Sequence, residues 1–357
     1  MLSFKRGKVE EVLAKRPGCT EILVQIEGER SKAINYDQLT GNISPGDIVV
    51  VNTTAVELNL GTGGYHFVIN NLSRENMPLE GQGHIMKLRY TPMQMKVLSV
   101  EEEASPFRKK LEVADSLKQT PVVAALLHSM LAPVALAIKA QASKKIRVVY
   151  MMTDGAALPL ALSRIVPELL ERGLIHGTVT VGNAFGGQIE AVNIYSGLLA
   201  AKSVLEADII IAAMGPGIVG TGTKWGFSGV EQGFVLNAAA VLEGIPLAVP
   251  RISFADPRSR HYGISHHTLT VLQKVALAPT VVPMARLPEN QMQVVLEQWK
   301  EARLQRHCLK VVEAEKQFEE LVVSGLNLAT MGRSPEKDKA FFLTSVAAGI
   351  VAAELAG

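Results

Sequence analysis

The sequence predicts an α/β protein: a parallel, Rossmann-like doubly wound sheet preceded by a small N-terminal β-barrel of the SH3 or OB type and followed by C-terminal helices. Three observations predict this class. Short strand patterns fill the first hundred residues, apolar runs then alternate with helical patterns, and helical patterns close the chain. We therefore expect a barrel-like domain over 1–100, a polar connector over 101–120 and an α/β domain over 121–357.

The composition is that of a folded, near-neutral protein. Of its 357 residues, 48% are hydrophobic and 20% charged, and the formal net charge is +2. This supplies enough apolar surface for a core and argues against disorder. It lacks the clustered positive charge typical of nucleic-acid binders, so nucleic acid is not an expected partner. Cys19 and Cys308 lie far apart, without a disulfide or metal spacing, which favours a reducing, cytoplasmic compartment.

Two apolar stretches resemble membrane spans but carry ionisable residues. Pro121–Ala140 contains His128 and Lys139, and the tail Phe341–Gly357 contains Glu354. A span needs about 20 apolar residues with few charges. We interpret the first stretch as a buried strand leading into a helix and the second as a packed or interface helix, compatible with a homodimer. No membrane partner is expected.

The first hundred residues contain short runs rich in β-branched residues between turn signals. The predicted strands cover 7–12, 21–26, 47–52 and 65–70. Ser44-Pro-Gly-Asp47 predicts a turn, because proline presets one backbone dihedral and glycine tolerates the next.

From Pro121 onward, buried strands alternate with helices, which implies right-handed crossovers and a parallel sheet. The predicted strands cover 122–127, 146–151, 177–181, 208–213, 245–249 and 280–283. The predicted helices cover 158–172, 189–205 and 230–243. In the tail, Ser334-Pro-Glu-Lys is a typical helix start.

Polar and glycine-rich segments follow these strands and do not precede them. The carboxyl ends of parallel strands share one edge of a sheet, and ligands bind there. The candidate ligand-binding residues after the first three strands are His128, Asn183, Gly186 and Gly187. Asp154, after the second strand, is a candidate catalytic acid or metal ligand, or a helix cap. Gly186 and Gly187 would admit an anion or serve close helix packing.

The fourth strand is followed by a glycine-rich segment. Its candidate ligand-binding residues are Gly215, Gly217, Gly220, Thr221, Gly222, Thr223 and Lys224. Glycines let backbone amides approach a phosphate or carboxylate, and Lys224 adds a positive charge. The segment matches neither the P-loop nor a dinucleotide fingerprint after the first strand. A long turn without a ligand is the alternative.

The fifth strand leads into Arg251–His267, a loop unusually rich in ionisable side chains. Arg251 and Arg258 offer two-pronged donors for an anion. His261 and His266 would act as general acid or base, with Asp154 or Asp256 orienting them or holding a divalent metal ion. Adjacent histidines point in different directions on a helix, so we expect at most one of His266 and His267 to reach the site. Ser265 would cap the helix that starts there. No metal-binding sequence motif is present, and a divalent ion remains an open alternative.

Several of these segments together resemble one family. They are Leu127-His-Ser, Met152-Thr-Asp-Gly-Ala-Ala-Leu-Pro, the run from Gly182 to Asn193, Gly215-Pro-Gly-Ile-Val-Gly-Thr-Gly-Thr and Arg260-His-Tyr-Gly-Ile-Ser-His-His-Thr. The chain is similar over essentially its full length to a bacterial family described as domain of unknown function 3866. The resemblance implies a bacterial cytosolic protein and supplies no catalytic residues.

The sequence therefore predicts an enzyme, a hydrolase or group transferase, that binds a small phosphorylated or otherwise anionic metabolite at the carboxyl ends of the strands. One alternative is a non-catalytic ligand sensor or interaction protein that uses the barrel as its protein- or RNA-binding module. Another is a metal-dependent hydrolase.

Overall fold

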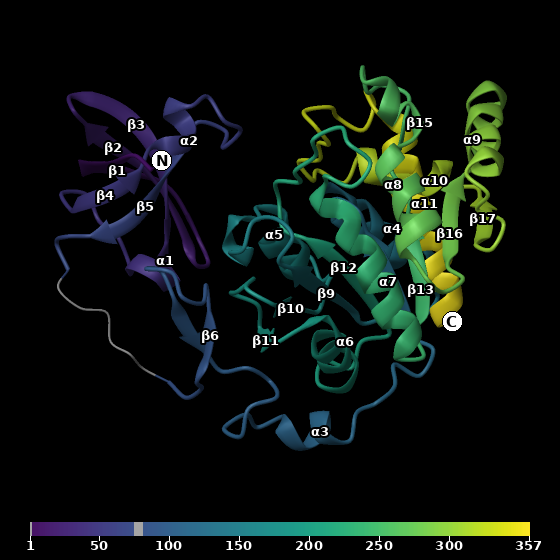
Figure 1. The fold of residues 1–357 in the computed structure, drawn as a ribbon, viewed down its shortest axis with the longest axis horizontal. Helices are drawn as coiled ribbons and strands as arrows, with labels where there is room; N and C mark the ends of the chain where they lie inside the picture. The colour runs from purple at the N-terminus through teal and green to yellow at the C-terminus, as the bar shows by residue number, and fades with distance from the viewer. Residues whose placement is uncertain (1, 75–80) are drawn as a thin grey trace. The chain divides into compact units, whose positions relative to one another are not determined.

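The chain divides into two compact units, which are described separately. The structure is a computed structural model that describes residues 2–74 and 81–357. The first unit ends at Leu98 and the second runs from Ser99 to Gly357. Figure 1 shows the elements of each unit.

The first unit is a closed β-barrel with the strand order β1-β2-β3-β5-β4. The parallel pairing of β3 with β5 and the antiparallel pairing of β1 with β4 close it. Alternate side chains point inward to a small core that includes Val24, Val49 and Val68. The elements of this unit are β1 Phe4–Arg16, β2 Cys19–Ile26, β3 Glu29–Tyr36, α1 Asp37–Thr40, β4 Ile48–Asn52, α2 Thr54–Glu57, β5 Tyr65–Asn71 and the hairpin β6 Ile85–Lys87 with β7 Met95–Val97.

The second unit is built on an all-parallel sheet, which among the described residues has eight strands in the order β11-β10-β9-β12-β8-β13-β16-β17. The central strands are fully buried apolar runs, as expected for a parallel sheet covered on both faces. The strands are β8 Pro121–Ala125, β9 Val148–Thr153, β10 Gly177–Val181, β11 Ile189–Ala191, β12 Ile209–Met214, β13 Ile245–Val249, β16 Val281–Ala285 and β17 Cys308–Val312. A short ladder outside this sheet pairs β14 Ile252–Ser253 with β15 Gly263–Ile264.

Helices cover both faces of the sheet (Figure 1). On one face α6 packs on β9 and β10, and α7 packs on β8 and β13; on the other, α11 packs on α4 and on β16. The helices are α3 Arg108–Glu112, α4 Leu131–Gln141, α5 Ile165–Glu171, α6 Ile194–Ser203, α7 Glu231–Val241, α8 His266–Thr270, α9 Glu289–Glu301, α10 Glu315–Val322 and α11 Lys339–Ala356.

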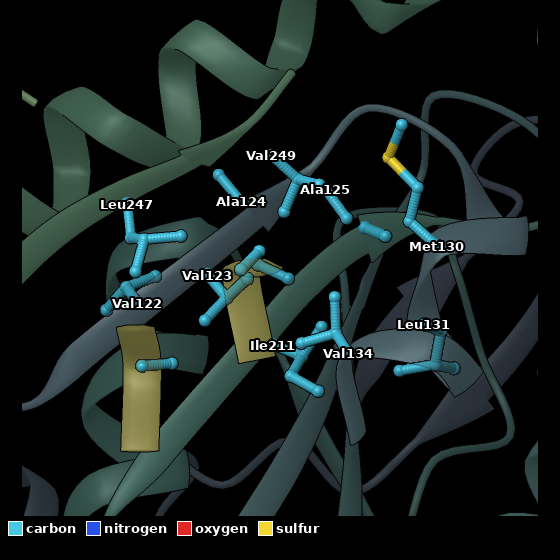
Figure 2. Close-up of a cluster of buried hydrophobic side chains, with 14 of the residues drawn as sticks. Val122, Val123, Ala124, Ala125, Met130, Leu131, Val134, Ile211, Leu247 and Val249 are labelled. Carbon is cyan, nitrogen blue, oxygen red and sulfur yellow. The ribbon is translucent and has the colours of Figure 1, made fainter. Parts of the chain in front are cut away.

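The core of the second unit is centred on β8, the first strand of the sheet in chain order. Figure 2 shows side chains of β8, β12 and β13 meeting α4. The labelled residues are Val122, Val123, Ala124, Ala125, Met130, Leu131, Val134, Ile211, Leu247 and Val249.

Strand β8 also lies at the topological switch point of the sheet. The chain leaves β8 through α4 and crosses over β12 to reach β9, whereas it leaves β12 through α7 and crosses over β8 to reach β13. The two connections diverge on opposite faces and leave a crevice between the carboxyl ends of β8 and β12, which is where open α/β sheets bind ligands.

Helix α11 is, in the described part of the chain, the one helix long and apolar enough to cross a membrane. Most of its length is nevertheless buried, against α4 and the sheet. It is packed as a core helix, and the expectation of a packed tail is confirmed.

The predicted fold class is confirmed, with the barrel, the parallel sheet and the C-terminal helices all present. Several details differ from the expectations, and three of them concern where elements begin or end. The helix expected from residue 189 begins at Ile194, because Asn193 caps it and residues 189–191 form β11. The helix expected from Ser334 begins at Lys339. The segment 101–120, expected as a connector, belongs to the second unit, where Leu117 is fully buried and its amide donates to the Leu242 carbonyl.

Candidate functional site

A cavity of about 600 Å³ lies at the carboxyl ends of β8 and β12. Leu127, His128 and Ser129 line it from β8, and residues 214–218 line it from β12. The start of α5 and the segment 327–331 complete its walls. Its size is that of a pocket for a small molecule, and its position is the switch point of the sheet.

Two side chains that line this cavity, His128 and Ser163, are hydrogen-bonded to each other, and the buried Tyr150 lies behind them. The Nε2 atom of His128 lies 2.8 Å from the Ser163 hydroxyl, and its Nδ1 atom lies 3.2 Å from the Tyr150 hydroxyl. The Tyr150 hydroxyl donates to the carbonyl of Ala213, so its oxygen can accept a hydrogen bond from Nδ1 of His128 in the tautomer that carries its proton there. This arrangement leaves Nε2 of His128 free to accept the proton of Ser163.

The electrostatics of this group are set by burial. Burial lowers the pKa of His128 to about 4 and holds the pKa of Tyr150 well above its ordinary value. His128 is therefore a neutral imidazole near pH 7. Ser163 is 1% exposed in total, lines the cavity, and also accepts a hydrogen bond from the Val166 amide at the start of α5. A serine hydroxyl hydrogen-bonded to a histidine that a third group orients is the arrangement of an activated nucleophile.

A pair of carboxylates lies at the same edge of the sheet, after β9 and at the start of α7. Asp154 is exposed, and its carboxylate accepts a hydrogen bond of 2.9 Å from the backbone amide of Asn183. Glu231 accepts a hydrogen bond from the Thr153 hydroxyl and packs against Gly155, where a β-carbon would collide with its carboxylate. Burial, reinforced by the charge of Asp154, raises the pKa of Glu231 to about 7.

A cluster of three histidines lies in the segment after β14. His261, His266 and His267 each offer a ligand atom, and these atoms lie within 4.8 Å of one another. Ser265 caps α8, as expected, and its hydroxyl also lies 2.7 Å from Nδ1 of His261. Both adjacent histidines contribute to this cluster, whereas we expected at most one of them to reach the ligand site at the strand ends. Both lie in the first turn of α8, with ring centres 4.3 Å apart, and His261 approaches the two from the preceding loop.

The histidine cluster is strongly desolvated. Burial is the main cause that lowers the pKa of His261 to about 3 and that of His267 to about 3, and it also lowers the pKa of His266. Neighbouring arginines depress the pKa values of all three further. The lowered pKa values keep these imidazoles neutral near pH 7, the form in which a ring nitrogen can accept a proton or bind a metal ion.

The glycine-rich loop covers the histidine cluster. A β-carbon on Gly220 would lie 3.2 Å from Cε1 of His267, and one on Gly222 would lie 3.4 Å from the guanidinium carbon of Arg260. Phe227, at the end of the loop, stacks on the His267 ring with 4.0 Å between centres.

Much of this loop is bonded to itself. The Thr221 amide donates to the Gly226 carbonyl, and the hydroxyls of Thr221 and Thr223 lie 2.9 Å apart. Lys224 lies over the Trp225 ring. These bonds build a turn over the histidines, and Gly215 and Gly217 are the members of the predicted anion nest that line the cavity.

The arginines of the loop after β13 are held by Asp256. Its carboxylate receives hydrogen bonds of 2.8 Å from Arg251 and of 2.9 and 2.8 Å from Arg258, and Arg333 lies 3.5 Å away. Asp256 is 5% exposed, and the hydrogen bonds from Arg258 hold its pKa well below the ordinary range. This geometry describes a buried ion cluster. It fits a structural role for Asp256 better than the expected role of acid or base, and it engages both arginines expected to bind an anion, although the Arg258 side chain is still 37% exposed.

Gly186 and Gly187 have their amides occupied within the sheet edge. The Gly186 amide donates to Glu190, and the Gly187 amide donates to the Thr180 hydroxyl. A β-carbon on Gly187 would lie 2.8 Å from the Thr180 amide nitrogen. Gly187 is therefore a close-packing position, but it packs against strand β10 and not against a helix as the alternative had it.

Comparison with protein-family models matches the chain to a family described as "Protein of unknown function (DUF3866)" over residues 32–349. The match begins in the barrel and ends within α11. The chain belongs to the DUF3866 family. No curated protein matches it.

The fold of this DUF3866 chain gathers the expected residues into separate groups on one edge of the sheet. His128, Gly215 and Gly217 line the cavity; Asp154 and Asn183 lie beside Glu231; residues 220–224 cover the histidines. Sequence reasoning missed Ser163, Tyr150 and Glu231. The sequence did contain one indication of Ser163: the polar pair Ser163-Arg164 interrupts the apolar run between Leu162 and Ile165.

Proposed function

We propose that this protein is a hydrolase or group transferase that acts on a small anionic metabolite held in the cavity between β8 and β12. The observation that carries the proposal is the 2.8 Å contact between Ser163 and His128 in a cavity at the switch point of the sheet. The proposal includes a cytoplasmic location, where thiols stay reduced, and the free cysteines, one buried and one exposed, fit it.

The proposed reaction begins with attack by the Ser163 oxygen on a carbonyl carbon or phosphorus of the substrate. The Ser163 proton passes to Nε2 of His128, and His128 then gives it to the leaving group, whose bond to the substrate centre breaks. Water or a second substrate releases the group from Ser163 in a reverse sequence of proton transfers.

The environment of His128 favours an anionic substrate. Among the described residues, the hydrogen-bonding partners of its ring are the hydroxyls of Ser163 and Tyr150 and the backbone of Met214, and no carboxylate is one of them. A negative charge on the substrate would stabilise the imidazolium that forms in the low-dielectric cavity. Arg164, which follows Ser163, and Glu168 line the same cavity and bring one positive and one negative charge to it.

The test is covalent labelling of the purified protein with a fluorophosphonate, a reagent that phosphonylates activated serines. We expect mass spectrometry to find one label, on Ser163. The Ser163→Ala variant should lose it, and His128→Gln should slow labelling about 100-fold or more, since general-base assistance contributes roughly that much. Ser129→Ala is the matched control, because Ser129 lines the same cavity and bonds to Thr330 instead of His128.

The pH dependence of the labelling rate gives an independent check. The rate should be constant near neutral pH and fall as the pH drops through about 4, because protonation of His128 removes the acceptor on Nε2. Equal labelling rates in wild type and His128→Gln would overturn the proposal. Binding of small anions in a thermal-shift screen without any labelling would favour the ligand-sensor alternative.

A further inference from the structure

We propose that His261, His266 and His267 form a binding site for Zn²⁺ or a similar late first-row transition-metal ion. This site is separate from the Ser163–His128 pair and does not rest on the function proposed for it. Its three imidazoles come from one short stretch of chain, the loop before α8 and the first turn of α8. Their ligand atoms lie within 4.8 Å of one another, so small side-chain rotations bring them to the spacing of ligands around one ion.

Unpaired nitrogens are the first argument for a metal. Nε2 of His266 and Nδ1 of His267 are buried without a hydrogen-bond partner among the described residues. Leaving a buried polar atom unpaired costs about 1–3 kcal/mol, and here two such atoms lie in one cluster. A bound ion would give both of them a partner.

The surroundings of the cluster orient its rings, which is the second argument. The Ser265 hydroxyl engages Nδ1 of His261, which leaves Nε2 of that ring as its ligand atom. Phe227 stacks on His267 and fixes its plane. Gly220 lets the covering loop approach the His267 ring, where a larger residue would press on it. Ring orientation by neighbouring groups of this kind is typical of histidine metal ligands.

The chemistry of the donors selects the metal. Three imidazole nitrogens suit Zn²⁺, Cu²⁺, Ni²⁺ or Co²⁺, whereas Mg²⁺ and Ca²⁺ prefer oxygen. The nearest acidic residue of this loop, Asp256, is already bonded to Arg251 and Arg258. Three protein ligands leave one position of a tetrahedral ion for water or another small ligand, as in catalytic zinc sites.

The experiment uses the full-length, metal-free protein and cobalt as the probe. We expect Co²⁺ to bind at one equivalent with the intense visible absorption bands of a tetrahedral ion, and Zn²⁺ to displace it. Competition with a chelating dye then gives the Zn²⁺ affinity. Each of His261→Gln, His266→Gln and His267→Gln should weaken binding more than about 100-fold, because a lost ligand costs at least as much as a lost supporting contact.

Two further variants keep the test decisive. His176→Gln, at the opposite edge of the sheet where its Nδ1 accepts from the Val148 amide, should bind Co²⁺ like the wild type. His266→Cys replaces one ligand with another, so it should retain Co²⁺ and add a thiolate-to-cobalt absorption band. Thermal unfolding of every metal-free variant shows that it is folded.

The proposal is overturned if the wild type takes up neither Co²⁺ nor Zn²⁺ at one equivalent. It is also overturned if uptake survives in all three glutamine variants, since the ion would then lie elsewhere. Either result leaves the labelling of Ser163 unaffected, so the two proposals fail separately.

Discussion

Glu231 is a carboxyl group whose protonation depends on its neighbours at the start of α7. Burial and the charge of Asp154 raise its pKa to about 7, against an ordinary value of 4.5, while the Thr153 hydroxyl acts in the opposite direction. Between these two pH values the folded protein holds a proton at Glu231 that the unfolded chain has released.

We therefore expect Glu231 to make the protein less stable as the pH rises. The free energy of unfolding that depends on Glu231 is fully present below about 4.5 and declines up to about 7, because the folded state binds more protons across this range. Urea unfolding of wild type and Glu231→Gln at a series of pH values measures the difference. Asp154→Asn should shrink the decline by removing the neighbouring charge. Parallel curves for wild type and Glu231→Gln would show that the pKa is not raised.

Single residues of the site were only partly predictable. The sequence indicated His128, because it is an ionisable residue directly after a buried strand. It did not indicate Tyr150, whose hydroxyl is hidden within an apolar run, or Ser163, which lies where one continuous helix was expected. Hydrogen bonds between residues far apart in sequence decide these roles, and no local pattern reports them.

At the scale of elements, α4 and α11 lie in unusually close contact. Gly349 faces α4, and a β-carbon there would collide with the Val134 carbonyl and lie 2.7 Å from the β-carbon of Ala137. The helices can approach this closely because one side chain is missing at their crossing. The same contact buries α11, which is apolar around its whole circumference.

Gly349→Val should therefore force the two helices apart. We expect a loss of about 1–3 kcal/mol in the free energy of unfolding, the usual cost of overpacking a core, offset slightly by the better helix propensity of valine. Urea denaturation with far-UV circular dichroism measures it. Glu354→Ala on the same helix removes a half-exposed ion pair with Lys310 and should cost less than about 1 kcal/mol. Equal effects of the two changes would contradict the close contact.

The strands could be predicted from the sequence where they are fully buried and therefore apolar. Strands β8, β9, β10, β12, β13 and β16 were predicted within a few residues, because each is an apolar run between turn signals. Strand β11 was missed because it has three residues and leads directly into the cap of α6. Strand β17 was missed because it is an edge strand whose residues are exposed or half-buried, which weakens the apolar signal.

At the scale of the whole molecule, the second unit contains all the residues assigned to the proposed reaction and to the metal site. It has its own extended apolar core, and the barrel has a separate one. Since each unit buries its own hydrophobic surface, each meets the physical requirement for folding alone.

We expect a fragment that covers Ser99–Gly357 to fold without the barrel. Its urea unfolding should be a single cooperative transition, and Ser163 should react with the fluorophosphonate at the wild-type rate. Far-UV circular dichroism and the labelling assay check the two statements. An insoluble fragment, or one without a cooperative transition, would show that the barrel is needed to complete the second unit.

The position of β8 also determines when the sheet can assemble. Its sheet partners lie much later in the chain: Val122 pairs with Ile210, and Pro121 pairs with Ile245. During synthesis, this strand emerges from the ribosome long before either neighbour exists, while β9 and β10 can pair early. The centre of the sheet therefore closes over long loops, and such non-local pairing slows folding. The newborn chain has to keep an apolar strand unpaired until β12 has been made, which makes β8 a segment that a chaperone would protect.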